Sequence, residues 1–237
     1  MSKHNSYWMY GVHAVKSALK NKKRKIYELI LMEGHENSEI TDAASQRKIK
    51  WDVQKKKDFQ TLVHPDWVHQ GVIAKCEPLA GNYNLEGETF LMLDQITDPH
   101  NLGAMLRSAA AFGIDGIIVQ EKNSPHESGT LAKTASGALE IVPIYRMTNL
   151  SRTLEDLKKE GFWVMGLDER GDKELHQADM KGKIVFVMGA EGEGIRRLVK
   201  DNCDFLVRLP TEPEFPTLNV SVAAALTLYE WRRQKCL

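Results

Sequence analysis

Short apolar runs alternate with amphipathic helical patterns from residue 90 onward, and no other feature of this 237-residue chain constrains its fold as strongly. Six runs are predicted as strands: Phe90–Ile96, Gly116–Val119, Val142–Tyr145, Phe162–Leu167, Ile184–Gly189 and Phe205–Leu209. Four segments have helical spacing: Asn101–Phe112, Leu150–Glu160, Ile195–Asp201 and Asn219–Gln234. Apolar strands separated by amphipathic helices are typical of a parallel sheet covered on both faces. The sequence therefore predicts an α/β fold with a parallel sheet.

The first 80 residues form a smaller region with its own alternation of elements. Helical patterns occur at Val12–Leu19, Glu39–Ile49 and Lys57–Val63, and strand patterns at Lys25–Met32, Trp51–Val53 and Gly71–Cys76. Glycine, asparagine and proline gather in Pro78–Thr89, which is the composition of a linker. We therefore expect two domains, residues 1–77 and 90–237, joined by a linker at 78–89.

Positive charge is concentrated in the first region. Residues 1–80 carry 14 basic and 9 acidic side chains, a net charge of +5, although the whole chain is neutral. The basic residues form three runs, at 22–25, 47–50 and 55–57. This asymmetry indicates that the first region binds a polyanion. The alternative is that the basic residues form a solvated surface.

Composition excludes several classes of protein. With 42% hydrophobic and 27% charged residues, the chain is close to the globular average, which excludes wholesale disorder. No apolar run approaches the roughly 18 residues that a membrane helix needs. The three scattered cysteines argue against a disulfide framework and fit a reducing cytoplasm. The spacing of His13, His64, His69 and Cys76 matches no common zinc pattern, so we expect no metal.

Ligands of open parallel sheets bind at the carboxyl ends of the strands. The first such segment, DPHNLGAMLRSA, follows Ile96. Asn101 can cap the next helix, and Gly103 allows close backbone approach. Arg107 lies among small and apolar residues in the second helical turn. It is either a surface residue or an arginine whose guanidinium points into a site.

The second segment, MGAEGEG, places glycines at 189, 192 and 194. Their order differs from the dinucleotide fingerprint G-x-G-x-x-G, and Glu191 and Glu193 would repel a phosphate. This pattern disfavours a nicotinamide dehydrogenase and suits a neutral or cationic ligand, or an ordinary tight turn without a ligand.

The third segment, LPTEPEFPTLNVSVA, starts at Leu209 and contains three prolines that stiffen a loop. Asn219 and Ser221 stand at the start of the following helix, where they are either helix caps or functional residues. The small residues of this helix also suit a close helix contact, for example between subunits.

Taken in this order, the three segments resemble the three signature motifs of the SpoU family of RNA ribose 2′-O-methyltransferases. YGVHAVKSAL near the start and HQGVIA at 69–74 resemble the small L30e-like substrate-binding domain of the branch that methylates a guanosine of 23S rRNA. The resemblance implies a Rossmann-like catalytic domain with a C-terminal deep trefoil knot, S-adenosylmethionine as cofactor, homodimers formed through the knotted domain, and RNA as substrate. The lack of a long apolar run predicts no membrane partner. A tRNA methyltransferase and a non-catalytic RNA-binding protein of the same fold remain as alternatives.

The resemblance also implies roles for particular residues. The family's functional positions correspond to Asn101, Arg107, Glu191, Asn219 and Ser221, with Arg107 beside the ribose hydroxyl. Cofactor contacts correspond to Gly189, Glu191, Gly194, Leu209, Leu218 and Val220. The third motif departs from the family pattern at Thr211, Pro213 and Thr217, and Pro213 puts the path of the loop in question. Tyr7, Trp8 and Tyr10 are candidate stacking platforms for RNA bases, with buried packing as the alternative.

Overall fold

The computed structural model describes residues 6–79, 84–212, 214–215 and 217–236. They pack as two compact units: unit 1 comprises Met1–Ala80 and His126–Ile141, and unit 2 comprises Gly81–Pro125 and Val142–Leu237. Within the described residues, no helix is both long and apolar enough to cross a membrane. Pro213, whose effect on the third motif is in question, lies outside the described residues.

Unit 1 is built on a four-stranded sheet in the order β1-β4-β2-β3. Its elements are β1 (Tyr7–Tyr10), α1 (Val12–Lys20), β2 (Ile26–Met32), α2 (Ser38–Gln46), β3 (Lys50–Gln54), α3 (Lys56–Gln60), β4 (Val72–Cys76), α5 (Gly129–Ala135) and a 3₁₀ turn, η1 (Ala138–Glu140). β2 and β3 are parallel, whereas β4 is antiparallel to both of its neighbours, β1 and β2. The six elements predicted for this region are confirmed, but β1 was not predicted, because a four-residue aromatic run becomes a strand only through its pairing with β4.

The aromatic residues of β1 serve the core of unit 1. Tyr10 is buried and stacks on Trp67 with ring centroids 4.5 Å apart. Tyr7 is half-buried, and its hydroxyl donates to Glu127 Oε1 at 2.6 Å. Because burial and the adjacent Glu127 carboxylate both raise the pKa of Tyr7, its phenol stays neutral. The idea of Tyr10 as an exposed stacking platform is therefore wrong. Trp8 is half-buried, with the Lys75 ammonium 5.7 Å from the centre of its ring.

The helix α5 packs with unit 1 although it is far from the other members of this unit in sequence. A Cβ at Gly129 would lie 2.4 Å from the carbonyl oxygen of Trp8, so α5 approaches β1 at a distance that only glycine allows. Arg24, which is fully buried, pairs with Glu127 and with Glu140 on either side of this helix. The predicted boundaries placed residues 126–141 with the second domain, whereas these contacts place them in unit 1.

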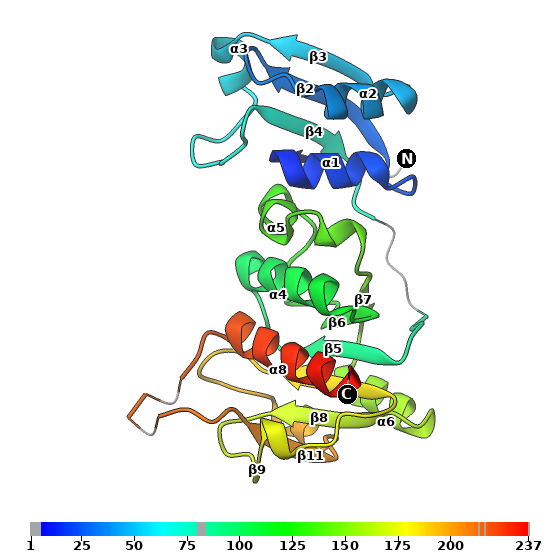
Figure 1. Cartoon of the computed structure of the whole chain (residues 1–237), viewed down its shortest axis with the longest axis vertical. Helices are drawn as coiled ribbons and strands as arrows, with labels where there is room; N and C mark the ends of the chain where they lie inside the picture. Colours follow the sequence, from blue (N-terminus) through cyan, green and yellow to red (C-terminus); the bar gives the residue numbers. More distant parts are fainter. Residues whose placement is uncertain (1–5, 80–83, 213, 216, 237) are drawn as a thin grey trace. The chain divides into compact units, whose positions relative to one another are not determined.

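Unit 2 contains a seven-stranded sheet in the order β7-β6-β5-β10-β8-β11-β9, and all its strands are parallel. Its elements are β5 (Thr89–Leu93), α4 (Pro99–Phe112), β6 (Gly116–Gln120), β7 (Ile144–Met147), α6 (Leu150–Lys159), β8 (Trp163–Leu167), β9 (Lys173–Glu174), η2 (Leu175–Gln177), β10 (Ile184–Met188), α7 (Arg197–Lys200), β11 (Phe205–Arg208) and α8 (Val220–Lys235). The predicted α/β fold with a parallel sheet is confirmed, and all six predicted strands are present (Figure 1).

Helices cover both faces of this sheet, as the unbroken apolar strands predict. On one face, α4 and α8 pack together, and Phe186 of β10 meets Trp231 of α8 edge to face. On the other face, Phe90, Val164 and Val185 pack with the apolar side of α6 and with Val199 of α7. Adjacent residues of one strand thus point into different cores.

Candidate active site

The glycine turn after β10 joins the ends of two neighbouring strands. β5 and β10 are paired from Ile184↔Thr89 to Met188↔Leu93, so both strands finish at the same edge of the sheet. A Cβ at Gly189 would lie 2.0 Å from the carbonyl carbon of Gly194, and Gly194 itself has φ +67°. Gly194 N–H donates to Ala190 O at 2.9 Å and closes the turn. Glycine at 189 and 194 therefore lets the chain fold back on itself and carry Glu191 at its tip.

The helix α4 begins earlier than predicted, which changes the role of Asn101. The N-cap is Asp98, whose carboxylate accepts from His100 N–H at 2.9 Å, and Pro99 occupies the first helical position. Proline suits that position because its missing N–H would have no helical partner there. The proposed capping role of Asn101 is therefore wrong. Its side chain instead projects from the first turn and is available for other contacts.

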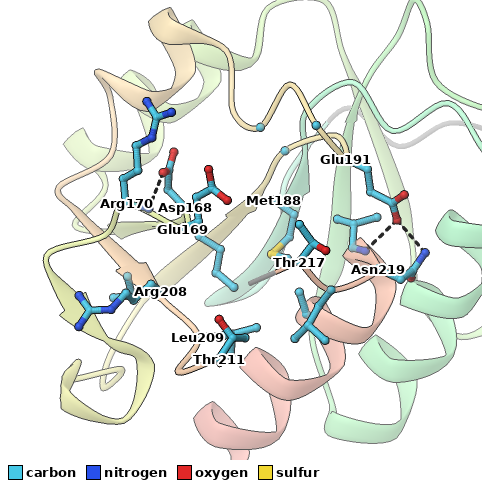
Figure 2. A pocket seen from close by; sticks show the side chains of 18 of the residues that line it. Asp168, Glu169, Arg170, Met188, Glu191, Arg208, Leu209, Thr211, Thr217 and Asn219 are labelled. Atoms are coloured by element: carbon cyan, nitrogen blue, oxygen red, sulfur yellow. Dashed lines mark hydrogen bonds between the residues drawn. The ribbon is translucent and has the colours of Figure 1, made fainter. Parts of the chain in front are cut away.

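Asn219 links the three segments that the sequence singled out. Its Nδ2 donates to Glu191 Oε1 at 2.7 Å and to Asn101 Oδ1 at 3.1 Å. Val220 N–H also donates to Glu191 Oε1, at 3.1 Å (Figure 2). Asn219 Oδ1 accepts from the N–H of Ser221 at 2.9 Å, so Asn219 is at the same time the N-cap of α8. The structure thus joins four of the five predicted functional residues in one hydrogen-bonded cluster.

A cavity of about 1120 Å³ opens beside this cluster. The six residues predicted to contact a cofactor all line it: Gly189, Glu191, Gly194, Leu209, Leu218 and Val220. Thr211 and Thr217, two positions at which the third motif departs from the family pattern, line it as well. Leu209 is half-buried, and with Met188 and Val220 it gives the cavity an apolar floor.

Acidic side chains stand on two sides of the cavity. Glu191 lies on one side, and Asp168 and Glu169, at the carboxyl end of β8, lie on the other (Figure 2). Although burial alone would raise the pKa of Asp168, hydrogen bonds from the Lys200 ammonium and from Arg170 N–H hold it below the usual value of a carboxyl. Asp168 and Lys200 were not predicted as lining residues. Asp168 directly follows a buried parallel strand, and a polar residue at that place is a signal that would have identified it.

Arg107 stands apart from the cluster. It lies on α4 six residues beyond Asn101, which places it about 120° away around the helix axis. The side chain is exposed, and across residues 6–79, 84–212, 214–215 and 217–236 it forms no hydrogen bond or ion pair. The Glu191 carboxylate accepts instead from Asn219 Nδ2 and Val220 N–H. The guanidinium is therefore free to contact a substrate.

A buried carboxylate that the sequence analysis missed holds the glycine turn in place. Asp94, at the end of β5, is fully buried and accepts from Arg196 N–H at 2.9 Å and from Arg196 Nε at 2.8 Å. Its own N–H donates to Met188 O at 2.8 Å. Because Arg196 follows directly after the glycine turn, Asp94 fixes the turn against the strand that leads to Asn101.

Replacing Asp94 with alanine is expected to weaken cofactor binding as well as the fold. The loss leaves two Arg196 donors without their buried acceptor, which should lower the free energy of unfolding by about 1–3 kcal/mol. The matched control is Asp115→Ala, since Asp115 anchors the other end of β5 by accepting from Glu88 N–H and Thr89 N–H. Urea titration and calorimetry with S-adenosylhomocysteine measure both effects. Unchanged affinity in the Asp94 variant would show that the turn is held by other contacts.

Both units match known families. Residues 88–229 match the SpoU rRNA Methylase family, and residues 8–81 match the RNA 2′-O ribose methyltransferase substrate binding family. The chain is 40% identical over 240 residues to the 23S rRNA (guanosine-2′-O-)-methyltransferase RlmB of Pseudomonas aeruginosa, covering 96% of each chain. It is 37% identical over 239 residues to the protein of the same name from Escherichia coli K12, covering 96% of this chain and 98% of that protein.

Solved structures resemble the whole chain. The SpoU methyltransferase AviRb from Streptomyces viridochromogenes, in complex with the cofactor AdoMet, superposes with a TM-score of 0.84 at 21% identity, covering 98% of this chain and 91% of that one. An AdoMet-bound rRNA methyltransferase from Sinorhizobium meliloti gives a TM-score of 0.79 at 23% identity, covering 96% and 87%. These likenesses show a shared fold. The match over 88–229 and the RlmB relatives establish that the chain belongs to the SpoU rRNA methylase family.

Proposed function

We propose that this protein is an S-adenosylmethionine-dependent RNA ribose 2′-O-methyltransferase that modifies a guanosine of 23S rRNA. The observation that carries the proposal is the cluster of Asn101, Glu191, Asn219 and Ser221, which joins the three motif segments beside a cavity. The substrate follows the RlmB relatives, which match nearly the full length of the chain. A 23S rRNA substrate also places the protein in the cytoplasm.

The cavity fits S-adenosylmethionine better than it fits a dinucleotide. Its apolar floor can take an adenine ring, and Glu191 and Glu193 complement the positive sulfonium. Of the three basic residues that line it, Lys200 and Arg208 are paired with Asp168 and Glu174, and only Arg170 has no ion pair in the described part of the chain, so the pyrophosphate of NAD would find a single unpaired cation. We assign the cofactor contacts to Gly189, Glu191, Gly194, Leu209, Leu218 and Val220.

Catalysis then depends on alignment and on removal of one proton. When bound, S-adenosylmethionine supplies a methyl group that is already activated. The chain must hold the ribose 2′-oxygen in line with this methyl group and assist loss of the hydroxyl proton. We assign the second task to Arg107, which either accepts the proton or stabilises the developing negative charge on oxygen. Asn101 and Asn219 hold the ribose, and Glu191 fixes Asn219 through the 2.7 Å hydrogen bond.

In this proposal, the first domain recognises the RNA. We assign residues 1–77 to substrate binding, 78–89 to a linker and 90–237 to catalysis, with residues 126–141 of the catalytic sequence packed against the first domain. The match over residues 8–81 and the net charge of +5 support this assignment. A tRNA substrate remains the alternative, and the substrate test below separates the two.

We further propose a homodimer that forms through a knotted catalytic domain. Leu218, Val222, Leu226 and Tyr229 are each at least 40% exposed. The last three recur at helical spacing along α8, so they form one apolar stripe of the kind that marks an interface. The knot is supported by the path of the chain, because the glycine turn at 189–194 and the segment that leads from Leu209 into α8 line the same cavity.

Purified protein is expected to bind S-adenosylhomocysteine but not NAD, and to methylate 23S rRNA. Titration calorimetry measures the first, and transfer of labelled methyl from S-adenosylmethionine, mapped to one guanosine 2′-oxygen, measures the second. Methylation of tRNA in place of rRNA would establish the alternative substrate. Binding of RNA without transfer would indicate a non-catalytic member of the family, and tight NAD binding without S-adenosylhomocysteine binding would overturn the proposal.

A further inference from the structure

The topology of unit 1 brings two separate lysine runs to one edge of its sheet. β2 and β3 are parallel, with Glu28 opposite Lys50, so both strands start at the same edge. The loops that lead into these strands carry the runs at 22–25 and 47–50. β4 is antiparallel and ends at this edge, where Cys76 lies opposite Ile26 (Figure 1). We call Lys22, Lys23, Lys25, Lys48 and Lys50 the lysine edge.

The two arginines of these runs have structural roles. Arg24 is buried among carboxylates. Arg47 donates through Nη1 to the carbonyl oxygens of Ala18 and Leu19, both at 3.0 Å, and through Nη2 to that of Arg24 at 2.7 Å. The last carbonyls of a helix carry partial negative charge, which would oppose an anion at this edge. Arg47 offsets that charge at the end of α1 and ties the two loops together.

The ammonium groups of the lysine edge are accessible to solvent or to a partner. All five are exposed, and Lys22, Lys23, Lys48 and Lys50 form no ion pair within the described part of the chain. Lys25 alone is paired, with Glu77 at 3.1 Å. In both runs the arginine has structural contacts and the lysines are exposed. The positive charge that remains at this edge is therefore carried by flexible, hydrated ammonium groups.

A shallow hollow adjoins the edge. It has a volume of about 400 Å³ and is lined by Ser6, Tyr27, Glu28, Lys50 and Lys75. The Lys75 ammonium lies 5.7 Å from the centre of the Trp8 ring, so a second cation borders the hollow from β4. With Lys50 and Lys75 against one carboxylate, Glu28, the lining of the hollow carries a net positive charge, which suits a phosphate better than an apolar ligand.

We propose that the lysine edge is the surface by which unit 1 holds the phosphate backbone of RNA. The inference rests on the proposed function and names where the substrate lies on the first domain. Lysines act as point charges, so this surface orients RNA without reading its sequence. The third basic run, at 55–57, follows the carboxyl end of β3 and therefore lies at the opposite edge of the same sheet. Its three lysines are also exposed, so replacing them removes the same charge as replacing three lysines of the lysine edge, and this run is the matched control.

The test compares two triple variants of the full chain, K22Q/K23Q/K48Q and K55Q/K56Q/K57Q, by filter binding to a 23S rRNA transcript at several salt concentrations. Each lost phosphate contact lowers the salt slope by roughly 0.7–0.9, so the salt slope of the triple edge variant should fall by up to about 2–3. It should also raise KM for RNA with kcat unchanged, whereas the control variant behaves as wild type.

Other outcomes overturn the inference. Equal losses in both variants would show a general charge effect, and wild-type affinity in the edge variant would place RNA on another surface. In both of these cases methylation by the wild-type protein would leave the proposed function standing. If the wild-type protein neither bound nor methylated RNA, the proposed function itself would fail.

Discussion

Arg107→Ala is expected to reduce single-turnover methyl transfer by at least about 10²-fold, because a group that assists proton removal contributes on the order of 10²–10⁴ in rate. The side chain is exposed and unpaired in the described part of the chain, so folding should change by no more than about 0.5 kcal/mol. Affinity for S-adenosylhomocysteine should also stay the same, since Arg107 does not line the cavity. Rapid-quench measurements with saturating RNA and cofactor isolate the chemical step.

Arg152→Ala provides the control for this experiment. Arg152 is likewise an exposed arginine on a helix of unit 2, where its backbone N–H donates to the Asn149 side chain. It should retain the wild-type rate. If the Arg107 variant matched the control, Arg107 would be a surface residue and proton removal would have to be assigned to another group.

Arg24→Met is expected to destabilise unit 1 by about 3–5 kcal/mol, which is typical when one partner of a buried ion pair is removed. Arg24 is fully buried, donates from Nη1 to Glu77 O at 2.8 Å and pairs through Nη2 with Glu140 Oε1 at 2.6 Å. Its loss leaves the Glu127 and Glu140 carboxylates facing each other without a cation. A unit of this size should then melt more than about 10 °C earlier, as followed by calorimetry and by hydrogen exchange of β2 and β4.

Two further variants give this prediction its controls. Lys23→Met changes the neighbouring exposed residue and should leave stability within about 0.5 kcal/mol of wild type. The triple variant R24M/E127Q/E140Q removes all three charges and should recover part of the lost stability, because a neutral set of similar volume carries no buried charge. A stable single variant would mean that water reaches the carboxylates and that the ion pairs contribute little.

Local pattern was sufficient to predict the sheet of unit 2 and the place of the site. Apolar runs of strand length separated by helical spacing specify a parallel sheet wherever they occur, because both faces of such a strand must be covered. The rule that ligands bind at the carboxyl ends of parallel strands then predicted which three segments would meet. The roles of Asn101, Glu191 and Asn219 in those segments were predicted instead from the resemblance to the SpoU family.

The sequence by itself therefore determined the class of fold, the family and the segments that form the site. Only the tertiary structure decided which groups are bonded to one another. Asn219 and Asn101 lie 118 residues apart and Arg24 and Glu140 lie 116 apart, and neither pair has a local signature. The hydrogen bonds between Asp94 and Arg196 and the packing of α5 with unit 1 also have no local signature in the sequence. Periodicity reports which face of an element is buried, whereas the partner of a polar side chain depends on where distant parts of the chain come to lie.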